Sequence, residues 1–163
     1  RGVLMSAVFS PCRRWRYRLE RGLGSLGEDR TIAFVMLNPS TADETKNDPT
    51  IRRCLGFAAS LNFTDVLIGN AYAWRSTDPR ALWAAADPVG PENDAHIEAI
   101  ARDADLVVCA WGVHAKPDRV AAVLAVLARA GRQPHALRTT KSGAPSHPLY
   151  LPASLTPVPW SPP

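Results

Sequence analysis

The chain has 163 residues, of which 46% are hydrophobic and 21% are charged. This is the composition of a single globular domain, large enough to bury a core without disulfide or metal staples. No apolar run approaches the ~18 residues that a membrane-spanning helix requires, so we expect no membrane partner. The net charge of +4 permits an anionic partner without requiring one.

The two ends of the chain differ in composition from the middle. Residues 1–30 form an Arg-rich segment in which we expect a strand over 15–20. Residues 152–163 form a Pro-rich tail that is expected to run extended, with Trp160 packed against the domain. The first methionine is Met5, and we expect the natural chain to start there rather than at Arg1. The opening residues lack the pattern of a secretory signal, which makes the cytoplasm the expected location.

Cysteine and histidine spacing points to neither a disulfide framework nor a metal site. The three cysteines are Cys12, Cys54 and Cys109, an odd number that includes no Cys-x-x-Cys pair. The histidines show no ligand spacing either. Phosphate-binding, dinucleotide-binding and zinc-protease motifs are also missing from the sequence, so we expect no metal and no cofactor.

Strand-like and helix-like segments alternate between the two ends. Continuous apolar runs predict buried strands at 32–37, 66–71 and 106–110, with a weaker one at 135–139. Helices are predicted to begin at Pro49, with Asp48 as the N-cap, at Pro91 and at Pro117, and Gly131 ends the last of them. This alternation predicts a single α/β domain with three layers (α/β/α) and a mostly parallel central sheet.

The fold class predicts where a ligand binds. In open α/β sheets the ligand occupies the crevice beyond the carboxyl ends of the strands. The loops that follow the predicted strands are residues 38–43, 72–79, 111–112 and 141–149, and they carry many polar side chains. We therefore expect these four loops to form one site.

Three side chains in these loops are candidate catalytic groups. Asn38 follows a buried strand and precedes a proline, so its amide can orient a water molecule; an Asx-turn or a helix cap is the alternative. Asp43 is the candidate general base, because Asp48 already has a structural role as a helix cap. His147 lies between prolines and can donate a hydrogen bond to developing negative charge, although a solvated loop histidine is the alternative.

The same loops carry candidate substrate-binding residues. Hydroxyl and backbone N–H groups at 40–41 suit an anion-binding turn. The indole of Trp74 can stack on a base, and a place in the core is the alternative. Gly112 follows a predicted strand and allows close approach of a ligand. The candidates are Ser40, Thr41, Asn70, Trp74, Arg75, Trp111, Gly112, Lys141 and Ser146.

Arginines alternate with aromatic residues near the N-terminus. Arg13, Arg14 and Arg16 enclose Trp15, and Tyr17 follows. Guanidinium groups interleaved with aromatic rings suit contacts with phosphates and bases. An exposed strand with one charged face is the alternative interpretation.

The chain closely resembles a bacterial and phage family named Domain of Unknown Function 1643. The resemblance extends over nearly the whole chain. Its segments are residues 16–19, 35–43, 48–52, 70–79, 88–94, 110–112 and 140–151.

The same loops, in the same order, also resemble those of the uracil-DNA glycosylase superfamily. The segment 37–40 is similar to the water-activating loop of those enzymes, and 107–112 to a hydrophobic strand that ends in glycine. The resemblance implies that Asn38 positions water, Asn70 recognises the edge of the base and His147 stabilises the departing base anion. The sequence departs from the pattern after His147-Pro148, where leucine replaces the usual serine, and in its Pro-rich tail, which replaces a closing helix.

The resemblance implies a DNA base glycosylase, a hydrolase that cleaves the N-glycosidic bond of a modified or damaged base. Such an enzyme flips the base out of the duplex and holds the DNA phosphates with basic side chains. The candidate nucleic-acid-binding residues are Arg13, Arg14, Arg16, Arg52 and Arg53. Two alternatives remain: a non-catalytic nucleic-acid-binding module on this fold, and an enzyme that acts on free nucleosides or nucleotides. A monomer is the default expectation.

Overall fold

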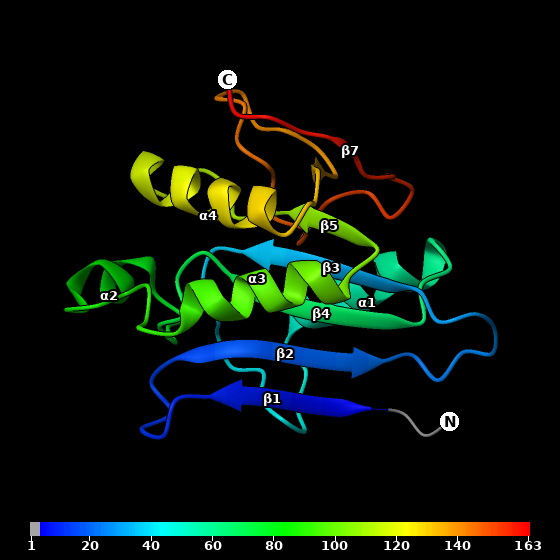
Figure 1. The fold of residues 1–163 in the computed structure, drawn as a ribbon, viewed down its shortest axis with the longest axis horizontal. Helices are drawn as coiled ribbons and strands as arrows, with labels where there is room; N and C mark the ends of the chain where they lie inside the picture. The colour runs from blue at the N-terminus through cyan, green and yellow to red at the C-terminus, as the bar shows by residue number, and fades with distance from the viewer. Residues whose placement is uncertain (1–3) are drawn as a thin grey trace.

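The computed structural model describes residues 4–163, and so the first three residues of the segment before Met5 lie outside it. In this range one sheet has the strand order β1-β2-β4-β3-β5-β6-β7 (Figure 1). Its strands are β1 (Met5–Phe9), β2 (Arg16–Gly22), β3 (Thr31–Met36), β4 (Asp65–Asn70), β5 (Leu106–Cys109), β6 (Pro134–Ala136) and β7 (Val158–Pro159). The helices are α1 (Pro49–Ser60), α2 (Pro79–Ala84), α3 (Asn93–Asp103) and α4 (Pro117–Arg129).

The sheet is mixed. The central strands β4, β3, β5 and β6 pair in parallel. At the edges, β1 pairs with β2, β2 with β4, and β6 with β7, and all three pairings are antiparallel. The predicted α/β class is confirmed, but a mostly parallel sheet is not, because the Arg-rich start and the Pro-rich tail both add antiparallel strands at the edges.

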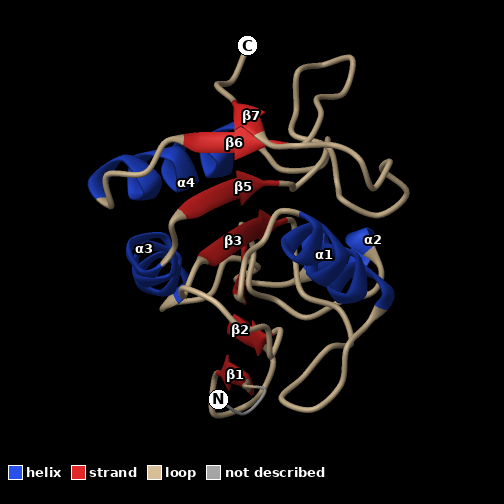
Figure 2. Ribbon diagram, turned by 90° about the vertical axis from the view of Figure 1, so that its right-hand side faces the viewer, coloured by secondary structure: helices blue, strands red, loops and turns tan. Residues whose placement is uncertain are grey.

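Helices cover both faces of the sheet (Figure 2). The strand β3 explains why, because its side chains alternate between the two faces. Ile32 and Phe34 pack in the cluster that contains the buried face of α1. Ala33 and Val35 pack in the cluster that contains α3 and α4. A strand covered on both faces has no polar side, which accounts for the continuous apolar run.

The predicted helix starts and stops are largely confirmed. Pro49 begins α1 after the N-cap Asp48, and Pro117 begins α4. Gly131, with φ of +71°, follows the last turn of α4. The α3 helix begins at Asn93 instead of Pro91. The weaker strand is shorter than predicted and ends at Ala136.

The central strands create a switch point at the carboxyl end of the sheet. From β3 the chain passes through α1 to β4 on one side, and it later returns to β5 on the other side of β3. The loops after β3 and β5 therefore diverge and leave a crevice between them. Trp160 of the tail is buried, as predicted, and packs edge-on against Trp111 after β5, with ring centroids 5.5 Å apart. No helix within residues 4–163 is long and apolar enough to cross a membrane.

Candidate functional site

Two hollows adjoin at this crevice and share Asn38 and His147. The first, the inner pocket, is small and polar, with a volume of about 40 Å³. Its lining is Arg16, Met36, Asn38, Pro39, Ser40, Asp48, Thr50, Ile51, Asn70 and His147. The second, the outer cleft, has a volume of about 360 Å³. Its lining is Leu37, Asn38, Trp111, Gly112, Val113, His114, Thr140, Ser146 and His147.

Asn38 has a fixed amide orientation. Its Nδ2 donates to the carbonyl of Ser76 at 2.8 Å and to that of Pro39 at 3.1 Å. Only the NH₂ group of the amide can donate to a carbonyl, so these partners settle which way the side chain faces. The Oδ1 atom is left as an acceptor, and Asn38 lines both hollows. An acceptor of this kind can orient a water molecule.

Asn70 ends β4 and is only 1% exposed. Neither its Nδ2 nor its Oδ1 has a hydrogen-bond partner among the described residues. A buried polar group without a partner costs about 1–3 kcal/mol, and such groups are rare in folded proteins. The main chain at this point is well held, because the carbonyl of Asn70 accepts from Asn93 at 2.9 Å. The side chain therefore presents a donor and an acceptor to a ligand.

His147 presents a donor to the same pocket. Its Nδ1 lies 3.2 Å from the backbone N–H of Leu149 and accepts from it. In the neutral ring the proton is then on Nε2. Burial lowers the pKa of His147 below its ordinary value, and the negative charge of Asp48 opposes this only in part. The ring is therefore neutral at neutral pH and carries a free Nε2–H.

Asp48 has the structural role predicted for it, and it also lines the inner pocket. Its Oδ1 accepts from the N–H of Ile51 at 2.9 Å, and its Oδ2 accepts from that of Ala42 at 3.3 Å. Arg16, predicted as a phosphate contact, is only 2% exposed and lines this pocket as well. Burial lowers the pKa of Arg16 to about 10, against the opposing effect of Asp48.

Asp43, the predicted general base, lines neither hollow. Its Oδ1 accepts from the N–H groups of Thr45 and Lys46, each at 2.9 Å. These two bonds stabilise the ionised carboxylate and lower the pKa of Asp43. The carboxylate that the fold brings to Asn38 and His147 is Asp48.

The candidate substrate-binding residues divide into two groups. Ser40 and Asn70 line the inner pocket, and Trp111, Gly112 and Ser146 line the outer cleft. The remaining candidates line neither; Trp74, for example, packs edge-on against Trp15 with ring centroids 5.6 Å apart. Those outside both hollows are Thr41, Trp74, Arg75 and Lys141.

Most of the predicted nucleic-acid-binding arginines already have partners. Arg13 forms an ion pair with Glu44 at 2.6 Å. Arg52 donates to the carbonyl of Asn47 at 2.9 Å, and Arg53 donates to the carbonyl of Leu151. Arg14 is exposed, with its guanidinium 6.0 Å from the ring of Trp74. With Arg16 buried, these five side chains do not form one row of free cations.

Several polar residues of the two hollows were not predicted as site residues. These polar residues are Asp48, Thr50, His114 and Thr140. The Asp48-Pro49 helix start beside a rim loop is a signal that could have placed Asp48 and Thr50 at the site. The burial of Arg16 has no comparable signal, because arginines flank it on both sides in the sequence.

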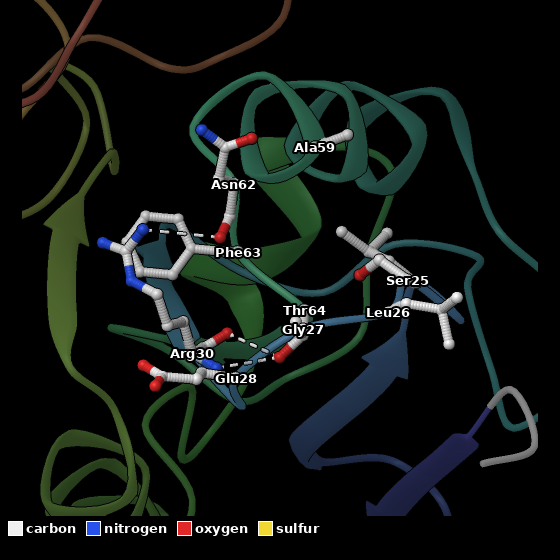
Figure 3. A pocket seen from close by; sticks show the side chains of 10 residues that line it. Ser25, Leu26, Gly27, Glu28, Arg30, Ala59, Asn62, Phe63 and Thr64 are labelled. Carbon is white, nitrogen blue, oxygen red and sulfur yellow. Dashed lines mark hydrogen bonds between the residues drawn. The ribbon is translucent and has the colours of Figure 1, made fainter.

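A separate cleft lies at the opposite end of the parallel strands, beside the starts of β3 and β4. Figure 3 shows the side chains that line it. It has a volume of about 540 Å³ and is lined by residues of 23–30 and 59–64. There the guanidinium of Arg30 lies over the ring of Phe63 at 4.5 Å, and the Thr64 hydroxyl donates to the Arg30 carbonyl. It includes none of the predicted site residues.

Fold and site together define a mixed α/β protein with a polar, partly unsatisfied pocket at the switch point of its sheet. A family model described as protein of unknown function, Domain of Unknown Function 1643, matches residues 16–149, and the chain belongs to this family. The curated proteins and solved structures compared with the chain gave no match. The matched region includes Arg16, Asn38, Asn70 and His147.

Proposed function

We propose that this protein hydrolyses the N-glycosidic bond of a modified or damaged base in DNA. The observation that carries the proposal is the amide of Asn70, buried and without partners in a pocket shared with Asn38 and His147. An amide with a free donor and a free acceptor matches the edge of a nucleobase, which presents both kinds of group.

The side chains fit the chemistry of this cleavage. The bond between the sugar C1′ and the base nitrogen breaks, its electron pair leaves with the base, and a water oxygen bonds to C1′. Asn38 Oδ1 accepts a hydrogen bond from that water and orients it. Asp48, the carboxylate in the same pocket, accepts the proton that the water loses. His147 Nε2–H donates to an oxygen of the departing base, where negative charge develops.

The position of the site also supports a relationship to the uracil-DNA glycosylase superfamily. Asn38 follows β3, Asn70 ends β4 and His147 lies on the loop after β6, all at the carboxyl end of the parallel strands. We extend the proposal to the fold: the parallel strands, with helices on both faces, correspond to the three-layer core of that superfamily.

A second candidate is the same cleavage on a free nucleoside. It is favoured by the arginines, since Arg13, Arg52 and Arg53 are bound within the protein and Arg16 is buried. An enzyme for free nucleosides does not need a row of cations to hold a DNA backbone.

A base-release assay tests the proposal. Single- and double-stranded oligonucleotides carry uracil, hypoxanthine, or hydroxymethylated or glucosylated pyrimidines, and abasic sites are detected by alkaline cleavage. We expect release from one substrate, reduced about 100-fold or more by Asn38→Ala and by His147→Ala. His135→Gln, a change on β6 away from both hollows, is the matched control and keeps the wild-type rate.

The assay separates the alternatives. Release of base from a mononucleoside, without binding to oligonucleotides, identifies the free-nucleoside enzyme. Binding to DNA that persists in both variants, with no release from any substrate, contradicts the hydrolase and identifies a binding module.

A further inference from the structure

Two arginines of β2 are equally buried but differ in their partners. Arg16 and Arg21 are each 2% exposed. Arg21 donates to the Asn47 side chain at 2.7 Å and to four backbone carbonyls, which occupies all three of its nitrogens. Arg16 donates to one carbonyl, that of Ala42, at 2.9 Å, and its Nε has no partner. A buried guanidinium with so few acceptors is destabilising unless a ligand supplies them.

The inner pocket collects further free donors around Arg16. Asn70 contributes its Nδ2, and His147 contributes its Nε2–H. Asp48 is the carboxylate in this lining, and both of its oxygens accept backbone N–H groups at the start of α1. No ion pair joins Arg16 to Asp48, although both side chains are described. The donors of Arg16 and Asn70 thus remain available to a ligand in this small pocket.

We propose that the inner pocket is a subsite for a planar oxyanion, bound by the guanidinium of Arg16 and the amide of Asn70. A volume of about 40 Å³ admits a few atoms, such as a carboxylate or the oxygen-bearing edge of a ring. Inorganic phosphate is tetrahedral, so it presents no planar edge to these donors and is not expected to bind. The same planar oxyanion chemistry has two sources: a carboxyl substituent on the ligand, or the edge of an anionic base.

The edge of an anionic base links the subsite to glycosidic bond cleavage, and this link rests on the proposed function. When the glycosidic bond breaks, the base takes the electron pair and its negative charge spreads onto its oxygens. An arginine already held in the pocket stabilises that charge without reorganisation. Arg16 would then be a catalytic residue beside His147, and the favoured substrates would be bases with ring oxygens at the edge that enters the pocket.

Anion binding to the intact protein tests the subsite without any turnover. The probes are acetate, barbiturate (a planar heterocycle that is anionic at neutral pH) and inorganic phosphate. Ligand-dependent rises in melting temperature and NMR shifts of the Asn70 amide report binding. We expect acetate or barbiturate to bind the wild type, and Arg16→Gln and Asn70→Asp to weaken binding at least tenfold. Phosphate should not bind.

The matched control is Arg21→Gln. It removes an equally buried arginine whose donors are all occupied, so it should lower the melting temperature more than Arg16→Gln does while keeping the anion-dependent rise. Should Arg16→Gln fail to fold, Arg16→Lys keeps the charge but loses the Nε donor and should weaken binding as well. Anion binding that is equal in wild type and both Arg16 variants, or missing from the wild type, overturns the subsite.

The outcomes also separate this inference from the proposed function. Binding of barbiturate assigns the pocket to an anionic base edge, and binding of acetate alone assigns it to a carboxyl substituent. Arg16-dependent anion binding without base release from any substrate supports the subsite and contradicts the hydrolase. Base release that Arg16→Gln does not change, with no anion binding, contradicts the subsite and supports the hydrolase.

Discussion

At the residue scale, the neutral state of His147 has a consequence for stability. Burial holds the pKa of this ring below its ordinary value in the folded protein. In the unfolded chain the pKa returns to about 6.5. Below that pH the unfolded state binds more protons than the folded state, and so the free energy of unfolding falls as the pH falls. Above it, both states are neutral and the effect vanishes.

We therefore expect His147→Gln to remove part of the acid sensitivity. Between about pH 8 and about pH 5, the variant should lose less stability than the wild type, as measured by urea unfolding at each pH. His96→Gln is the comparison, because His96 stacks on Tyr17 at 4.9 Å and burial lowers its pKa too. Equal acid sensitivity in wild type and His147→Gln would show that His147 is not held neutral.

At the scale of elements, α1 depends on its N-cap. Asp48 is 8% exposed and accepts two backbone N–H groups, one from Ile51 in the helix and one from Ala42 in the preceding loop. Asp48→Ala leaves both donors without partners in a buried site. We expect a loss of about 2 kcal/mol in the free energy of unfolding by urea, near the upper end for a cap.

The equivalent cap of α2 is the control for this prediction. Asp78 also precedes a proline, and it accepts from Arg80 at a more exposed position on a helix of 6 residues. Asp78→Ala should cost only about 0.5 kcal/mol, since water replaces the lost acceptor. Equal losses for the two variants would mean that the buried bond to Ala42 contributes nothing.

These two caps also show how far the sequence predicts the elements. The Asp48-Pro49 start was recognised because an apolar period of 3.6 follows it. Asp78-Pro79 carries the same signal, but α2 is too short to show a period, and it was missed. The strand β1 was missed because it lies at the sheet edge with a largely exposed pattern. Edge strands and short helices depend on neighbours that local sequence does not specify.

The site was predictable to the extent that strand ends determine it. Asn38 follows β3 and Asn70 ends β4, and the carboxyl ends of parallel strands meet at one edge of the sheet. His147 lies on the long loop after β6, so its exact position also depends on that loop. Two features depend instead on the path of residues 40–48. Asp48, and not the predicted Asp43, is the carboxylate at the pocket, and Arg16 is buried. That path is set by the burial of Ala42 and by its contacts with Arg16 and Asp48, which connect distant parts of the chain.

At the scale of the whole molecule, the Pro-rich tail supports the loop that carries His147. Trp160 is 7% exposed and packs on Trp111 at the end of β5. Its Nε1 donates to the Gly143 carbonyl at 2.9 Å, and its backbone N–H donates to that of Pro134 at 2.9 Å. This one residue thereby connects the tail, β6 and the loop 140–149, although no residue of the tail lines the inner pocket.

We expect Trp160→Ala to destabilise the protein by about 3–5 kcal/mol, as the loss of a buried indole does elsewhere. Trp160→Phe keeps a ring against Trp111 but loses the bond to Gly143, and it should cost about 1–2 kcal/mol. Urea unfolding measures both losses. Hydrogen exchange of the amides at 140–149 locates the effect, since Trp160→Ala should speed exchange there more than in β2, which lies toward the opposite edge of the sheet from the tail. Faster exchange spread evenly over the molecule would mean that the tail stabilises the fold as a whole rather than this loop.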